Sequence, residues 1–169
     1  MADINLWLDA YDDIYSDFDS RHFRNRRISE DFLAELQIEM KDQSQNPCNI
    51  ILFLPQEQRN VTTENVIINS LKDFFTRQCL FHGKKCNKKL KKGLIFFAIG
   101  VVVLWINSWI IYRAAESFSM VGLRVLLEPG GWFLLWAGFD FLVYDYPELK
   151  REKHFYKALR KMGIQFQSS

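Results

Sequence analysis

Residues 84–112 read Lys-Lys-Cys-Asn-Lys-Lys-Leu-Lys-Lys, followed by Gly-Leu-Ile-Phe-Phe-Ala-Ile-Gly-Val-Val-Val-Leu-Trp-Ile-Asn-Ser-Trp-Ile-Ile-Tyr. The second part, residues 93–112, contains no charged side chain. A helix needs about 20 apolar residues to cross a hydrocarbon core of about 30 Å, so this run predicts a transmembrane span. The lysines on its N-terminal flank predict that this end stays in the cytoplasm. The sequence therefore predicts an integral protein of the inner (plasma) membrane.

A second apolar stretch, from about residue 121 to 144, predicts a second span. Pro129 lies inside this stretch, and the backbone donor that proline lacks would kink a helix or mark its start. We favour one kinked spanning helix over a helix that begins near Pro129 after an interfacial turn. Basic residues follow at 150–161, so the positive-inside rule predicts a multi-pass hairpin, residues 93–144, with both termini cytoplasmic. The second span is interrupted by Arg124, Glu128 and Asp140.

Polar residues inside membrane segments are functional candidates by default. The candidates in this hairpin are Asn107, Ser108, Arg124, Glu128 and Asp140. Asn107 and Ser108 can form hydrogen bonds between helices or line a pore. Arg124 and Glu128 are four residues apart, so they share a helix face and can pair, or Glu128 can be solvated near the outer interface.

The segments outside the hairpin have the pattern of an α/β domain. Strands are expected at 4–8 and 50–54, and helices from a Ser29 cap to Lys41 and from Thr62 or Thr63 onward. The continuous apolar run Ile50–Leu54, which follows a polar turn, is typical of a central strand buried on both faces. Beyond the hairpin, a helix at 148–162 and an alternating strand at 164–167 are expected.

Two strands and two helices make a thin core, so a returning C-terminal strand is needed to complete the sheet. The predicted fold class is therefore an α/β cytoplasmic domain of order β-α-β-α plus a C-terminal α-β, with the two-helix transmembrane hairpin inserted. Residues 1–92 form its N-terminal part, and residues 145–169 complete it.

The most unusual local sequence is an acidic stretch, which has three interpretations. Its carboxylates are Asp12, Asp13, Asp17 and Asp19. First, nearby arginines at 21, 24, 26 and 27 neutralise the acids. Second, the carboxylates bind a divalent cation, Ca²⁺ or Mg²⁺. Third, an exposed acidic face docks on a basic cytosolic protein.

The lysines before the first span favour contact with anionic lipids, worth about 1 kcal/mol per basic side chain near the membrane surface. These residues are Lys84, Lys85, Lys88, Lys89, Lys91 and Lys92. No nucleic acid is expected as a partner, because no aromatic platform is interleaved with the lysines. Catalysis is not expected either, since no nucleophile signature or glycine-rich phosphate loop is visible.

Residues 6–19, Leu-Trp-Leu-Asp-Ala-Tyr-Asp-Asp-Ile-Tyr-Ser-Asp-Phe-Asp, resemble those of a group of uncharacterised prokaryotic membrane proteins. Ile-Ser-Glu-Asp-Phe-Leu at 28–33 extends this resemblance, and Glu-Pro-Gly-Gly-Trp-Phe at 128–133 resembles the same kind of small two-span protein. The resemblance implies no activity.

The leading functional hypothesis is a membrane protein that forms a homo-oligomer through its cytoplasmic domain and hairpin, as an ion-conducting pore or a membrane anchor. The alternative is a monomeric, membrane-tethered scaffold that recruits a cytosolic partner. A weaker alternative is a metal-dependent hydrolase that uses Asp17 and Asp19.

Overall fold

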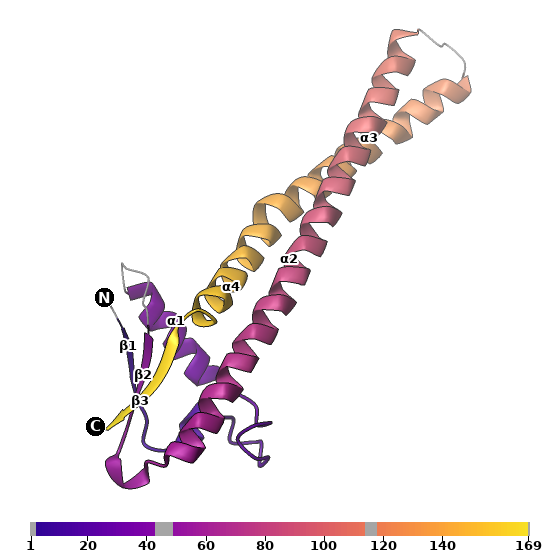
Figure 1. The fold of residues 1–169 in the computed structure, drawn as a ribbon. Coiled ribbons are helices and arrows are strands. Elements are labelled where there is room, and N and C mark those ends of the chain that lie inside the picture. Colours follow the sequence, from indigo (N-terminus) through magenta and orange to yellow (C-terminus); the bar gives the residue numbers. More distant parts are fainter. Residues whose placement is uncertain (1–2, 43–48, 114–117, 169) are drawn as a thin grey trace. The chain divides into compact units, whose positions relative to one another are not determined.

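The chain divides into two compact units. The first unit contains residues 1–79 and 154–169, and the second contains residues 80–153. The computed structural model describes residues 3–42, 49–113 and 118–168. It is mostly helical, with a small three-stranded parallel sheet and two long apolar helices (Figure 1). Most of the predicted polar turn, residues 43–48, and part of the predicted hairpin connection, residues 114–117, lie outside the described residues.

The sheet belongs to the first unit and contains β1 (Ile4–Trp7), β2 (Asn49–Leu54) and β3 (Gly163–Ser168). Its order is β1-β2-β3, and both pairings are parallel. In the register, Ile50 of the central strand lies opposite Ile4 on one side and Ile164 on the other. The last strand of the chain therefore completes a sheet whose other strands lie in its first third.

The remaining elements are helical. They are η1 (Tyr11–Ile14), α1 (Glu30–Asp42), η2 (Gln56–Gln58), α2 (Val61–Tyr112), α3 (Phe118–Asp140), η3 (Phe141–Asp145) and α4 (Tyr146–Leu159). Helix α2 runs through the lysine cluster without a break and contributes to both units. Ser29 lies just before α1, and its hydroxyl accepts a hydrogen bond from the Asp31 amide, as expected of a helix cap.

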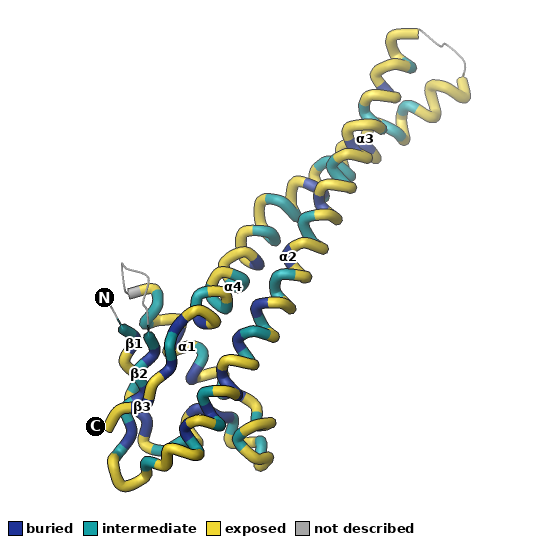
Figure 2. Tube along the Cα trace, in the orientation of Figure 1, coloured by how far each residue is buried: buried dark blue, intermediate teal, exposed yellow. Residues whose placement is uncertain are grey.

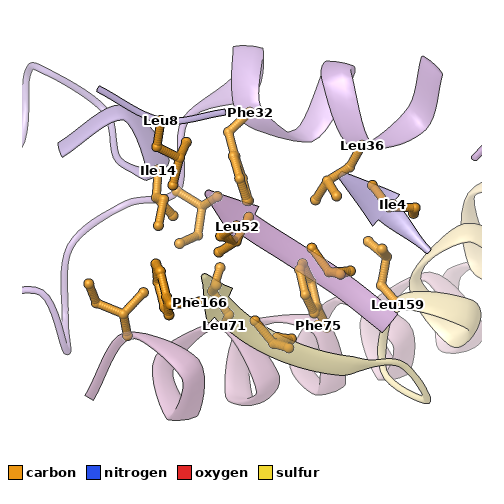
Figure 3. Packing of buried hydrophobic residues seen from close by; sticks show 14 of the residues in the cluster. Ile4, Leu8, Ile14, Phe32, Leu36, Leu52, Leu71, Phe75, Leu159 and Phe166 are labelled. Atoms are coloured by element: carbon orange, nitrogen blue, oxygen red, sulfur yellow. The ribbon is translucent and has the colours of Figure 1, made fainter. Parts of the chain in front are cut away.

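One apolar core holds the first unit together. The inward residues of the sheet include Ile4, Leu52 and Phe166, and each of them is buried. Figure 3 shows side chains from α1 and α2 gathered around Leu52. These helix residues are Phe32 and Leu36 of α1 and Leu71 and Phe75 of α2, each pair four residues apart and so on one face of its helix.

The prediction that residues 50–54 are buried on both faces is wrong. Burial alternates along β2, so that Ile50, Leu52 and Leu54 are buried whereas the residues between them are only half-buried. Both α1 and α2 contribute to the single core on the inward face. On the other face, Phe53 stacks on Trp7 with ring centroids 5.0 Å apart, and Trp7 is 72% exposed. A continuous apolar run looks the same in sequence whether a helix or only a neighbouring aromatic ring covers its second face.

In the second unit, α3 passes through Pro129 instead of starting there. This agrees with the favoured interpretation of the second apolar stretch, and the alternative start near Pro129 is wrong. Beyond α3 the backbone widens into the π-helical segment η3 before α4 begins. Two helical stretches, Val61–Tyr112 and Phe118–Leu159, are long and apolar enough to cross a membrane.

Four glycines allow α2 and α3 to approach closely in the second unit. They occur as two pairs spaced seven residues apart, Gly93 with Gly100 and Gly131 with Gly138. A Cβ atom added at Gly138 would lie 2.5 Å from the backbone nitrogen of Phe97, and one added at Gly100 would lie 2.6 Å from that of Leu135. Small residues of this kind let the backbones of membrane helices pack against each other.

Candidate functional site

The outer surface of the hairpin is apolar and uncovered. Large hydrophobic side chains are exposed along both helices. Figure 2 shows many residues of α2 and α3 in the exposed class, drawn in yellow. Trp105 is 76% exposed and Phe133 is 72% exposed. Soluble monomers rarely expose continuous apolar surface on this scale, and such surface marks a membrane or a protein interface. The structure therefore presents the hairpin as the principal candidate site.

The five polar candidates of the hairpin have different environments. Asn107 is buried, and its side-chain oxygen has no hydrogen-bond partner among the described residues. Arg124 is half-buried, and its Nε also has no partner within the described part of the chain. Ser108, Glu128 and Asp140 are exposed. No ion pair joins Arg124 to Glu128, although both residues are described, so the predicted i, i+4 pairing is not formed.

The closest approaches show where Glu128 lies along the hairpin. Gly100 packs on Leu135, and Gly131 packs on Leu104, so the two helices run antiparallel. Continuing this register places Glu128 near the level of Asn107, about 21 Å from Gly93 at a rise of 1.5 Å per residue. The same level lies about 7.5 Å from Tyr112, so Glu128 is an exposed carboxylate nearer to the connected ends of the two helices than to Gly93.

The lysine cluster divides into an exposed face and one internal partner. At about 100° per residue, five lysines fall within an arc of about 120° on α2. These exposed residues are Lys84, Lys85, Lys88, Lys91 and Lys92. Lys89 lies off this arc, where its Nζ donates to the Asp145 carboxylate at 2.6 Å and lies 4.9 Å from the centre of the Phe141 ring. Lys89 thus pairs with a carboxylate of the same unit, and its predicted contact with lipid stays a prediction.

A second contact between a basic and an acidic side chain of the same unit joins α2 to α4. The Nδ1 atom of His82 lies 2.8 Å from Oε2 of Glu152. Sequence reasoning did not identify Glu152 or Asp145 as partners, because each lies more than 50 residues along the chain from the basic residue that it meets. Both carboxylates reduce the positive charge where the two helices face each other. The exposed lysines therefore carry the positive charge of the outer surface.

The acidic stretch of the first unit is engaged by arginines. Asp12 accepts a hydrogen bond from Arg26, and Asp19 forms a two-atom pair with Arg21, at 2.8 and 2.7 Å. The backbone amide of Arg27 also donates to Asp19, at 2.9 Å. The Arg21 guanidinium holds the pKa of the Asp19 carboxyl well below its usual range. This geometry supports the interpretation in which arginines neutralise the acids.

The other two acids of the stretch do not converge on a common centre. Asp13 accepts hydrogen bonds from the Asp9 and Ala10 amides and so closes the turn of η1. Asp17 is exposed. No group of three or more His, Cys, Asp or Glu side chains in the described residues could hold a metal ion. The cation site and the hydrolase hypothesis thus stay predictions.

A titration with Ca²⁺ and Mg²⁺ tests the cation site directly. The carboxylates of Asp12 and Asp19 are already paired with guanidinium groups. We therefore expect millimolar concentrations of either ion to leave the melting temperature unchanged. An ion that binds only the folded state must raise that temperature. A saturable rise that disappears in Asp17→Asn would contradict the expectation and establish the cation site.

A buried carboxylate that sequence reasoning missed joins three segments of the first unit. Glu64 is 6% exposed and accepts hydrogen bonds from Arg59, at 2.9 and 3.1 Å, and from the Tyr11 hydroxyl at 3.2 Å. Arg59 also donates to the Phe166 carbonyl of β3, at 3.2 Å. Hydrogen bonds from Arg59 lower the pKa of Glu64 even though burial opposes this shift. The sequence signal was weak, because Arg59 and Glu64 look like ordinary polar residues at a helix start.

Comparison of the chain with protein-family models, with curated proteins and with solved structures finds no match. The class of protein is therefore defined by the geometry: one unit contains a small three-stranded parallel sheet, and the other contains two long, glycine-packed apolar helices with a lysine-rich face.

Proposed function

We propose that this protein is an integral membrane protein that self-assembles in the bilayer. In this proposal the hairpin of residues 93–144 spans the inner (plasma) membrane, and both termini lie in the cytoplasm. Residues 1–92 and 145–169 then form one cytoplasmic α/β domain that is discontinuous in sequence, in the order β-α-β-α plus α-β. Anionic lipids contact the five exposed lysines of α2.

The observation that carries the proposal is the uncovered apolar surface of two helices that already pack on each other. The four glycines bring the backbones of α2 and α3 together, so the large side chains point outward instead of filling the hairpin. Each residue of such a surface contributes favourably when it leaves water for hydrocarbon, by roughly 25 cal/mol per Å² of apolar area. A lipid bilayer provides this environment for the whole length of the helices.

Self-assembly is supported by the exposed Glu128. A carboxylate facing lipid inside a span is costly, by several kcal/mol, and such groups normally face a bundle interior or a water-filled cavity. The hairpin alone supplies neither for Glu128, because this residue is exposed and has no ion pair in the described residues. Packing of several hairpins around a shared centre would enclose Glu128 and Ser108, and an aqueous centre would make the assembly a pore.

The mass of the protein in nanodiscs tests this proposal. We expect more than one copy per assembly in the wild type and a smaller assembly in Glu128→Leu, because the leucine no longer needs a polar environment. Glu148→Leu is the matched control, since Glu148 is also exposed but lies in α4, outside the proposed span. A wild-type monomer contradicts self-assembly, whereas extraction of the chain from membranes by alkaline carbonate contradicts insertion itself.

The scaffold alternative is favoured by a different observation, the exposed aromatic face of the sheet. Trp7 stacks on Phe53 on the side of the sheet that lacks a covering helix in the described residues. In a monomeric protein this face would be the docking surface for a cytosolic protein. A monomeric wild type in nanodiscs, with a partner whose binding is lost in Trp7→Ala, would favour the scaffold over the assembly.

A further inference from the structure

A cationic pocket lies in the first unit, beside the loop that follows the acidic stretch. Arg21, Arg24 and Arg26 line it from the loop, and Arg77 lines it from α2. Its volume is about 360 Å³, and none of its lining residues is acidic. Four arginine side chains at one hollow give it a strong positive potential, which favours an anionic ligand.

The loop that carries three of these arginines is closed and attached to α2. Tyr15 and Ile28 form an antiparallel bridge at its base. The Ser70 hydroxyl of α2 lies 3.3 Å from the carbonyl oxygens of both Phe23 and Arg24, to which it can donate. Ser70 is itself 7% exposed, so this attachment is shielded from water. The pocket is consequently preorganised, which reduces the entropic cost of binding a ligand.

Only half of the positive charge is compensated from within the chain. Asp19 pairs with Arg21 and Asp12 pairs with Arg26, whereas Arg24 and Arg77 have no ion-pair partner among the described residues. Four guanidinium groups and two carboxylates leave two positive charges at the pocket. Arg24 and Arg77 therefore offer two exposed guanidinium groups to an anion at the pocket.

Arg26 also has an unused hydrogen-bond donor. Its side chain is 13% exposed, one of its terminal nitrogens donates to Asp12, and the other lies 3.5 Å from the Ser16 carbonyl. Its Nε is buried and has no acceptor within the described residues. Because this nitrogen is shielded from the surface, Arg26 forms a fixed wall of the pocket and leaves contact with a ligand to Arg24 and Arg77.

We propose that this pocket binds a small organic phosphate monoester, with Arg24 and Arg77 as its charge partners. A phosphate monoester carries about −1.5 to −2 charges at neutral pH, which matches the uncompensated charge. Guanidinium groups bind phosphate oxygens through two parallel hydrogen bonds. Phe74 supplies an apolar wall for the organic part of the ligand, and the volume is near the lower end of the roughly 300–1,000 Å³ range of ligand pockets. The phosphate can belong to a soluble ester or to a lipid headgroup such as phosphatidic acid.

Binding of phenyl phosphate to the full chain in phosphatidylcholine nanodiscs tests the proposal by calorimetry. We expect saturable binding of phenyl phosphate, weaker binding of inorganic phosphate and none of phenol. A second set of nanodiscs contains phosphatidic acid and distinguishes the two sources. Loss of phenyl phosphate binding there assigns the pocket to a lipid headgroup, and unchanged binding assigns it to a soluble ester.

Variants connect the binding to the pocket. Arg77→Gln and Arg24→Gln should each weaken phenyl phosphate binding at least about tenfold, because each removes a charge-assisted contact. Arg77→Lys should fall between Arg77→Gln and wild type, since lysine keeps the charge but loses the paired donors. Lys72→Gln is the control, because Lys72 is exposed on α2 and does not line the pocket.

Three results would overturn the proposal: no saturable binding of either phosphate probe, wild-type affinity in both glutamine variants, or displacement of phenyl phosphate by polyglutamate at lower concentration than by inorganic phosphate. If circular dichroism shows that Arg77→Gln does not fold, Arg24→Gln in the exposed loop provides the same comparison. None of these readouts depends on the number of copies in the assembly, so failure of this proposal is distinct from failure of self-assembly.

Discussion

Gly138→Ala is expected to separate the two helices of the hairpin. A Cβ atom at this position would lie 2.5 Å from the backbone nitrogen of Phe97 and 2.8 Å from its Cα, so the clash involves backbone atoms that no side-chain rotation can relieve. Overpacking of this kind typically costs about 1–3 kcal/mol. The midpoint of unfolding in an SDS titration, followed by the fluorescence of the hairpin tryptophans, should fall accordingly.

Two other glycines of α3 provide matched controls for this experiment. A Cβ atom at Gly122 or Gly130 would meet nothing within 4 Å. Alanine is a better helix former than glycine by about 1 kcal/mol, so Gly122→Ala and Gly130→Ala should leave the midpoint unchanged or raise it. An equal loss in all three variants would show that the helices do not depend on close approach at Gly138.

Glu64→Gln is expected to loosen the sheet of the first unit at its C-terminal strand. The change weakens the charge-assisted hydrogen bonds of Arg59, whose guanidinium also holds the Phe166 carbonyl. Hydrogen bonds to charged groups contribute about 1.5–3 kcal/mol. Hydrogen exchange of the β2 and β3 amides, measured by mass spectrometry on the full chain, should therefore accelerate by a factor of about 10–100.

The same variant should reveal the pH dependence of this unit. Because the pKa of Glu64 is lowered in the folded state, its stabilising effect is present above the ordinary carboxyl pKa of about 4.3 and is lost as the pH falls through the lower folded value. The difference between wild type and Glu64→Gln should be full near pH 7 and shrink below about pH 4. Glu57→Gln removes an exposed carboxylate of η2 and should match the wild type throughout. A difference that persists unchanged at pH 3 would contradict the role given to the carboxylate.

The outline of the fold was predictable from local patterns. The apolar runs of the hairpin and the alternation at residues 4–8 and 164–167 are signals that need no tertiary information. The face on which β2 is buried was predicted incorrectly, because it depends on both α1 and α2 packing on one side of the sheet. The start of α2 was predicted near Thr62 or Thr63, and the helix continues through the lysines because nothing in that run ends a helix.

Less of the candidate sites could be predicted. The acidic stretch and its neighbouring arginines lie within 16 residues of each other, and their pairing was one of the interpretations considered. Arg77 and Arg24 line the same pocket although they lie more than 50 residues apart in the sequence, and no local pattern connects them. The glycine pairs at seven-residue spacing were visible in the sequence, but only the packing of α2 on α3 reveals what they do.

The pairing of β3 with β2 has a consequence for synthesis of the protein. Ile50 meets Ile164 only after 114 further residues have been made, and these include the entire hairpin. Because the ribosome makes the chain from its N-terminus, the sheet lacks β3 until translation is nearly complete. Completion of the sheet requires the full length of both helices to have been made beforehand. A chain that stops early carries an unpaired β2 edge, and open strand edges of this kind favour aggregation.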